Sequence, residues 1–268
     1  MSTEDKRFSG IVSFVIATWK VNLASAMEYR LSFFLLAGMM FVNNMIWLFF
    51  WYLFFSRFPV VRGWELSDVM LLWAVSAGGF GWASVLFGNF PRIAAIVSSG
   101  QLDVYLSQPK PVLLNVLSSR MSVTGAGDFI FGLLVFLWAG DLSPTGCLLF
   151  ALALLLSGVL FIGVMTIAGS LAFWLGNAEG IASQVFGGFV SLTIYPTGIF
   201  RGAAKIALFT VVPAGFIGYM PIGLLRDFDP WFAFAAVGAA AGFGVGGRLM
   251  FRAGLARYAS GNAIGMRN

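Results

Sequence analysis

Long apolar runs, separated by short polar or charged stretches, dominate the chain. No charged residue lies between Arg30 and Arg57, and several later runs are also free of charge. Because about 20 apolar residues in a helix cross the hydrocarbon core of a bilayer, this pattern predicts an all-α membrane protein. Six transmembrane helices are expected, at residues 31–56, 69–90, 121–140, 147–175, 181–200 and 231–247.

The segment 10–30 follows a different pattern. Its larger apolar residues recur on one helical stripe, whereas polar and charged residues lie largely off that stripe. The pattern favours an N-terminal amphipathic helix in the membrane interface. An ordinary spanning helix is the alternative, against which Lys20 in mid-segment argues. The predicted stripe consists of Val12, Val15, Ile16, Trp19, Leu23 and Met27.

The segment 204–225, between the fifth and sixth expected spans, is apolar but broken. Pro213 and Pro221 interrupt it, and three glycines accompany them. Proline removes a helical hydrogen bond and clashes with the preceding turn, so two short half-helices are expected. Broken backbone at membrane depth is tolerated where protein or water satisfies it. The segment is therefore predicted to be re-entrant.

The distribution of Lys and Arg predicts the orientation. With six spans, eleven of the 16 basic residues lie on the side of the termini and five on the other side. A seventh span would change this balance to seven against nine. Because Lys and Arg accumulate in cytoplasmic loops, we expect six spans with both termini cytoplasmic. The polar stretch 98–111 then lies in the cytoplasm.

Composition excludes several classes of function. Hydrophobic residues make up 59% and charged residues 10%, against about 25% charged residues in soluble domains. Histidine is absent and Cys147 is the single cysteine, so neither a disulfide nor a cysteine-based zinc site is expected. The phosphate-binding pattern G-x-x-x-x-G-K-[ST] is also missing. We therefore expect no cofactor in this chain and no nucleic-acid partner, and a membrane-bound enzyme is disfavoured.

Glycines near the C-terminus match a nucleotide-binding pattern by spacing alone. Gly242-Phe-Gly244-Val-Gly246-Gly247 fits G-x-G-x-x-G, but it lacks the preceding strand and the later acidic residue that the dinucleotide site needs. Gly238, Gly242 and Gly246 instead repeat every four residues within a span. Such a face lets membrane helices approach closely, so it predicts helix packing.

Three polar residues within the expected spans leave their roles open. Asp128 is either a functional intramembrane charge or an interfacial acid paired with Arg120 or a neighbouring helix. Asn43 and Asn44 either line a substrate path or form hydrogen bonds between helices. Ion-coupled carriers usually need several carboxylates along the ion path. The shortage of carboxylates within the expected spans favours an energy source in another subunit. A self-sufficient carrier or channel is the alternative.

The polar stretch resembles a known family. Residues 100–111, GQLDVYLSQPKP, resemble the cytoplasmic loop of bacterial ABC type-2 transporter permeases with six spans. Further matching pieces follow in order, although Gln108 stands where that family often has arginine. These pieces are Phe173-Trp174, Tyr195-Pro196, Pro213–Phe216 and Tyr219–Pro221.

The resemblance implies one transmembrane permease domain over residues 1–268, in the bacterial inner membrane and surrounded by its lipids. Two separately encoded ATPase subunits would carry ATP and Mg, and a second permease copy or a paralogue would complete an export-type transporter. The broken helices would face the external side. An apolar path would suit a lipid, a lipid-linked glycan, a peptide or a drug-like substrate.

The resemblance also implies that residues 91–111 form a cytoplasmic coupling loop, with the N-terminal helix beside it. Its short coupling helix would sit in an apolar groove of the ATPase. Within the loop, glycine can end one short helix, aspartate can cap the next turn, and the prolines stiffen the return. A solvated loop without a partner is the alternative. The predicted coupling residues are Arg92, Ile93, Ile96, Gly100, Asp103, Tyr105, Pro109 and Pro111.

Overall fold

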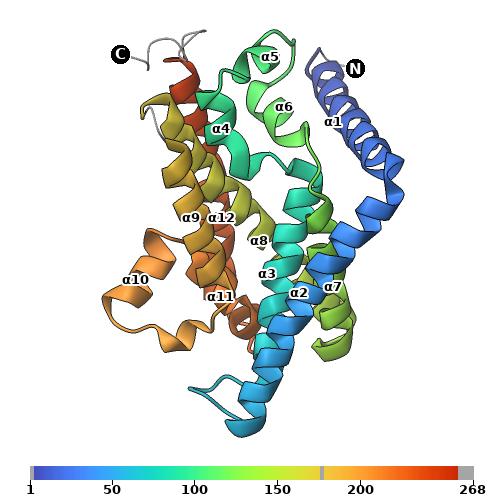
Figure 1. Cartoon of the computed structure of the whole chain (residues 1–268). Coiled ribbons are helices and arrows are strands. Elements are labelled where there is room, and N and C mark those ends of the chain that lie inside the picture. The colour runs from blue at the N-terminus through green and yellow to red at the C-terminus, as the bar shows by residue number, and fades with distance from the viewer. Residues whose placement is uncertain (1–2, 176–177, 259–268) are drawn as a thin grey trace.

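The computed structural model describes residues 3–175 and 178–258, and within these ranges the chain is helical. There is no β-strand in the described part beyond an isolated bridge between Val61 and Trp64. Long helices run side by side, and several short helices gather at the end where α1 begins and α12 ends (Figure 1). The predicted all-α membrane class is confirmed.

Six helices correspond to the six expected spans. Five helices of the described chain are long and apolar enough to cross a membrane, or up to seven if each of two bent helix pairs is one span. The five include the N-terminal segment Gly10–Glu28, whereas Val123–Ala139 is counted only as part of a bent pair and Ala178–Thr193 is not among them. The count of six stays a prediction. The corresponding helices are α2 (Arg30–Arg57), α3 (Leu66–Phe87), α7 (Val123–Ala139), α8 (Pro144–Ser170), α9 (Ala178–Thr193) and α12 (Pro230–Leu255).

The helix α12 extends eight residues beyond its predicted end at residue 247. Its start carries a clear signal, because the Asp229 side chain accepts a hydrogen bond from the Trp231 backbone N–H at 2.9 Å and Pro230 opens the helix. Such capping residues satisfy free N–H groups at a helix start. The predicted end at residue 247 lies directly before Arg248. A charge ends the apolar run there but not the helix.

Glycines bring α7 into backbone contact with two neighbours. A Cβ atom at Gly132 would lie 2.6 Å from the Ala74 carbonyl oxygen of α3. A Cβ atom at Gly127 would collide with the Ala37 carbonyl of α2. Small residues permit this approach, and packing in a membrane depends on it because lipid tails are as apolar as the side chains.

The contact between α8 and α12 does not use the predicted glycine face. Gly238 and Gly242 face open space in the described chain, and Gly246 has only a 3.7 Å neighbour. The close approach occurs at Gly247, where a Cβ atom would lie 3.0 Å from the Gly163 carbonyl oxygen. A four-residue repeat identifies a row on a helix, but it does not say which row the neighbouring helix contacts.

The helix α1 (Thr3–Glu28) lies obliquely outside the other helices (Figure 1). Trp19 Nε1 donates a hydrogen bond to the Leu86 carbonyl at 2.7 Å, and Asn22 Nδ2 donates to the Ser118 carbonyl at 2.8 Å. Val15 is buried, whereas most other members of the predicted apolar stripe, Val12 among them, are exposed. A location of α1 in the membrane interface stays a prediction.

The segment between α9 and α12 contains α10 (Ala203–Thr210), α11 (Ala214–Met220) and a π-helix (Pro221–Arg226). The predicted break is present, because the axes before and after residues 211–213 differ by 95°. The segment lies in the half of the molecule where α9 ends and α12 begins (Figure 1). This path agrees with re-entry, which stays a prediction.

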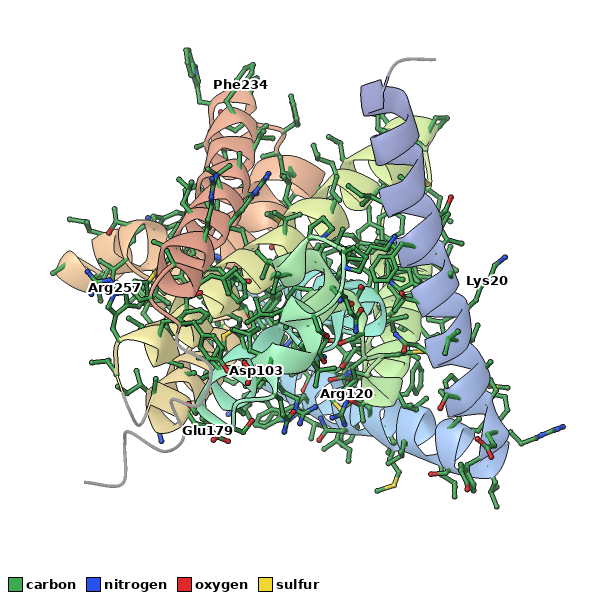
Figure 2. The ribbon with its side chains drawn as sticks, turned by 90° about the horizontal axis from the view of Figure 1, so that it is seen from above. Lys20, Asp103, Arg120, Glu179, Phe234 and Arg257 are labelled. Atoms are coloured by element: carbon green, nitrogen blue, oxygen red, sulfur yellow. The ribbon has the colours of Figure 1, made fainter. Side chains whose placement is uncertain are left out.

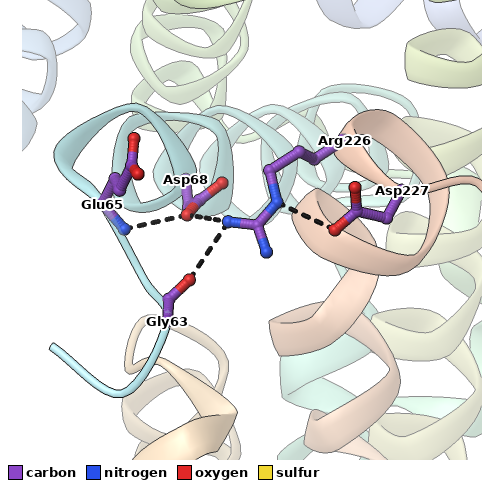
Figure 3. A network of polar contacts seen from close by, with 5 residues as sticks. All are labelled: Gly63, Glu65, Asp68, Arg226 and Asp227. Carbon is purple, nitrogen blue, oxygen red and sulfur yellow. Dashed lines mark hydrogen bonds and ion pairs between the residues drawn. The ribbon is translucent and has the colours of Figure 1, made fainter. Parts of the chain in front are cut away.

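An ion pair fixes the end of the broken segment to α3 (Figure 3). Arg226 Nη1 lies 2.5 Å from Asp68 Oδ2 and 3.2 Å from the Gly63 carbonyl oxygen, and Arg226 Nε lies 3.0 Å from Asp227 Oδ2. Asp68 is buried and also accepts a hydrogen bond from the Glu65 backbone N–H at 2.8 Å. The same carboxylate therefore caps α3 and binds the π-helix.

We expect Arg226→Met to destabilise the protein. The substitution leaves the buried Asp68 carboxylate without its cation, which costs about 1–3 kcal/mol in free energy of unfolding, with solvent around the partly exposed arginine reducing the effect. Thermal unfolding in detergent measures the change. The matched control is Arg57→Met, which alters an exposed arginine at the end of α2. Equal unfolding temperatures for the two variants would contradict the assigned role.

Candidate functional site

The predicted coupling loop forms a compact set of short helices. These are a 3-10 helix at Phe90–Arg92, α4 (Ile93–Ser98), α5 (Leu102–Leu106) and α6 (Val112–Ser118). They lie at the end of the molecule where α1 begins and α12 ends (Figure 1), and Asp103 and Arg120 lie near the centre of that end when it is seen from above (Figure 2).

Gly100 ends α4, as the sequence indicates. Its φ angle is +76°, a conformation that glycine adopts without steric cost. Its backbone N–H donates to the Val97 carbonyl at 3.2 Å, and the preceding Ser99 N–H donates to Ala95 at 3.0 Å. The chain can therefore reverse direction between α4 and α5.

Asp103 does not cap α5, contrary to the sequence-based expectation. The helix begins one residue earlier, with Gln101 at the cap position and no side-chain cap bond. Asp103 lies in the first turn and faces Tyr258. Burial, together with the neighbouring Asp103 carboxylate, raises the pKa of Tyr258 to about 12. Asp103 thus connects α5 with the chain that follows α12.

A polar network holds the short helices together. Asn89 Nδ2 donates to the Val116 carbonyl at 3.0 Å and to Ser119 Oγ at 2.8 Å. The Tyr105 hydroxyl lies 3.0 Å from the same Ser119 Oγ. Satisfied polar networks of this kind fix geometry. Tyr105 was among the predicted coupling residues, but Asn89 and Ser119 were not. The sequence feature that could have indicated them is a polar residue on either side of the loop.

Gln108 also has a structural contact. Its Oε1 accepts a hydrogen bond from Asn115 Nδ2 at 2.8 Å, which joins the return of the loop to α6. The neighbouring Lys110 Nζ lies 5.0 Å from the centre of the Phe14 ring of α1, within the range of a cation–π contact. Pro109 and Pro111 are exposed on either side of this lysine. The return is therefore anchored to both α6 and α1.

Ile93 and Ile96 do not face outward, and the expectation that they contact a partner directly is wrong for this conformation. Their exposed fractions are 0% and 2%. A Cβ atom at Gly169 would lie 2.7 Å from the Ile93 Cβ atom, so α4 packs closely on α8. An apolar helix face looks the same in sequence whether its own chain or a partner covers it.

The exposed apolar residues of the loop lie on α5 instead. Val104 is 62% exposed and Leu106 is 41% exposed. Arg92 is also exposed, and its Nη1 lies 3.5 Å from Asn89 Oδ1. We call Val104 and Leu106 the α5 surface. The bond between the Tyr105 hydroxyl and Ser119 Oγ holds α5, and with it this surface, in place.

A groove lies beside the loop return. Its volume is about 820 Å³, and both α1 and α12 contribute to its wall. Two of its lining residues, Lys110 and Arg248, are basic. Residues far apart in the sequence therefore meet at this end of the protein. The lining residues are Gly10, Ile11, Gln108, Pro109, Lys110, Pro111 and Arg248.

The intramembrane residues Asn44 and Asp128 form one contact. Asn44 Nδ2 donates to Asp128 Oδ1 at 2.7 Å, and both side chains are buried. Asp128 therefore bonds to the neighbouring helix α2 and not to Arg120. Of the two roles left open for Asn44, the hydrogen bond between helices is present. Asn43 is exposed.

Both asparagines and Asp128 also line a cavity of about 370 Å³ between α2, α3, α7, α8 and α9. We call it the central cavity. Its residues on α2 and on α3 each follow the spacing i, i+3, i+4, i+7, which marks one face of a helix. This spacing was available in the sequence, but the pairing of the two faces was not. The two rows are Met40, Asn43, Asn44 and Trp47, and Trp73, Ser76, Ala77 and Phe80.

Within residues 3–175 and 178–258, no three His, Cys, Asp or Glu side chains gather where they could hold a metal ion. What the geometry provides is an exposed apolar surface on a rigidly held loop, and a cavity between the long helices.

Comparison with known proteins agrees with these features. The model of a family described as ABC-2 family transporter protein matches residues 41–261, from within α2 to beyond α12. No curated protein matches the chain. This match covers most of the chain. The protein also has long helices that are apolar enough to cross a membrane. The chain belongs to the ABC-2 family of transporter proteins.

Proposed function

We propose that this chain is the permease subunit of an export-type ABC transporter and that separate ATPase subunits drive it. Two ATPase subunits bind ATP with Mg, and two permease copies, or one copy and a paralogue, form the path. The α5 surface carries this proposal, because Val104 and Leu106 are exposed on a loop that is otherwise tightly fixed. Exposed apolar residues on a rigid element suit a docking site.

The loop has the connections that energy coupling needs. Asn89 follows the end of α3, and its bonds to Val116 and Ser119 join α3 to α6. Asn22 of α1 is bonded to the Ser118 carbonyl, and Ile93 packs on α8. A displacement of α5 is therefore passed to several long helices at once. Packed elements of this kind move as bodies and do not deform smoothly.

We further propose that both termini are cytoplasmic, in the bacterial inner membrane. The start of α1, the end of α12 and the loop lie at one end of the described chain, and the excess of basic residues on that side supports a cytoplasmic location. The apolar surfaces of the long helices suit a lipid, a glycan carried on lipid, a peptide or a drug-like cargo.

The α5 surface is tested by placing a charge on it. We expect Val104→Asp and Leu106→Asp each to reduce co-purification of the ATPase that accompanies the unmodified chain at least tenfold, because a charge in an apolar contact costs several kcal/mol. Thermal stability of the permease should not change, because both side chains are exposed.

The matched control is Val211→Asp, which alters a valine that is still more exposed, between α10 and α11 and outside the loop. It should leave co-purification unchanged. By contrast, Ile93→Asp should lower the unfolding temperature of the permease itself, because Ile93 is buried. If the α5 variants retain the ATPase as well as the control does, the docking proposal is wrong.

The two loop prolines are expected to affect coupling and not docking. Pro109→Gly with Pro111→Gly increases the flexibility of the return at two exposed positions and leaves the contacts of Gln108 and Lys110 in place. ATPase association should stay close to normal, while ATP hydrolysis stimulated by the permease should fall several-fold. Hydrolysis by the purified complex in liposomes measures this effect. A complex that loses its ATPase instead would assign the prolines to docking.

Orientation is tested by labelling single cysteines in a Cys147→Ser background. A membrane-impermeant maleimide applied to intact cells should label Val60→Cys, in the exposed connection between α2 and α3, but not Ser99→Cys in the coupling loop. Both cysteines should react after the cells are opened. Labelling of Ser99→Cys in intact cells would overturn the assignment of that end to the cytoplasm.

A further inference from the structure

The central cavity leaves polar atoms unsatisfied in an otherwise apolar region. Asp128 is 2% exposed, and its Oδ2 has no hydrogen-bond partner among the described residues, although Oδ1 accepts from Asn44. Trp73, which lines the same cavity, has an Nε1 that likewise has no partner in the described chain. Buried polar atoms are nearly always paired, so the unpaired carboxylate oxygen indicates an occupant that complements a negative charge, whereas the Trp73 N–H needs an acceptor, which an ammonium group does not supply.

The charge of Asp128 selects the sign of that occupant. A carboxylate between membrane helices is costly unless a cation accompanies it. No basic residue lines the cavity. Asp68, the other acid that is buried among the described residues, forms its ion pair at the ends of α3 and the π-helix, away from this cavity. Without a basic residue beside it, the Asp128 side chain is neutralised either by a proton or by a cationic ligand, and a cation that enters the cavity takes the place of the proton.

Aromatic rings form much of the wall of this cavity. Trp47 and Trp73 stack with ring centres 6.1 Å apart. The ring centre of Phe80 lies 5.3 Å from that of Phe161 and 5.9 Å from that of Phe186. Aromatic faces attract organic cations, and quaternary ammonium groups are commonly recognised by several rings together. Rings and a carboxylate in one cavity thus favour the same kind of ligand.

The cavity has a size and an access route that suit a small amphipathic molecule. Its volume of about 370 Å³ lies within the range of about 300–1,000 Å³ found for small-molecule pockets. Asn43 and Trp47, which line it, are exposed on the surface of α2. A ligand can therefore enter from the side, between the helices.

We propose that the central cavity binds a lipophilic organic cation, with its ammonium group between Asp128 Oδ2 and the rings of Trp47 and Trp73. This assignment rests on the proposed function where it identifies the ligand as cargo. The binding itself does not require an ATPase. The inference thus names a substrate class, amphipathic amines and quaternary ammonium compounds, for a path whose walls are otherwise apolar.

The test compares a cation with a neutral molecule of the same shape. Phenyltrimethylammonium and tert-butylbenzene differ chiefly in charge. Binding of radiolabelled phenyltrimethylammonium to the purified full chain in detergent is measured by equilibrium dialysis, with protein-free micelles as the background. We expect saturable binding of the cation that tert-butylbenzene displaces at least tenfold less effectively than unlabelled cation does.

Two pairs of variants locate the site. Asp128→Asn should weaken cation binding at least tenfold, whereas Asp141→Asn, in the exposed connection between α7 and α8, should not. Trp47→Leu should weaken it several-fold, whereas Trp231→Leu, at the exposed start of α12, should not. If Asp128→Asn does not fold, the Trp47 pair decides the result, because Trp47 is partly exposed and tolerates replacement.

Equal affinity for the neutral probe, or unchanged cation binding in the folded variants, would overturn the inference. Because the chain is assayed without an ATPase, these results are separate from the proposed function. Loss of ATPase association with intact cation binding would count against the transporter assignment alone. Normal ATPase association without cation binding would count against this inference alone.

Discussion

The close approach of α7 to α2 and α3 is the constraint on which the interior depends. Gly127 and Gly132 have no side chain, and each faces a backbone carbonyl of a neighbouring helix. Between membrane helices, contact distance and hydrogen bonds replace the hydrophobic effect as the source of stability. The contact at Gly127 also brings the next residue, Asp128, within 2.7 Å of Asn44. The polar wall of the central cavity is thus a consequence of glycine packing.

The loop and the central cavity share α3. Its Trp73–Phe80 face lines the cavity, and its C-terminal end is joined to the loop region. The Gly88 N–H donates to the Arg120 carbonyl at 2.9 Å, and the Ser122 N–H donates to the Ser84 carbonyl at 3.0 Å, so α3 and the start of α7 are connected by backbone bonds. The two candidate sites are therefore connected through one pair of helices.

Sequence patterns predicted the long helices well because a charge-free apolar run and a bilayer obey the same solvation physics. The same patterns did not predict which apolar helix faces are covered by other helices of the chain. Ile93 and Ile96 form an apolar face that could have met a partner, and the structure covers them with α8. The bond between Asn44 and Asp128 joins residues 84 positions apart. Its existence depends on tertiary packing, which no local spacing encodes.

The distribution of fixed contacts indicates where the protein can move at least cost. The helix α3 is held at its start by the Asp68–Arg226 ion pair and beyond its end by Asn89. Most of α3 is buried, whereas most residues of α2 and α9 are not. Both α2 and α9 contribute walls to the central cavity. Because α2 is joined to α7 at Gly127 and by the bond from Asn44 to Asp128, moving α9 breaks fewer buried contacts than moving α2 or α3. We therefore expect the cavity to open along the wall formed by α9.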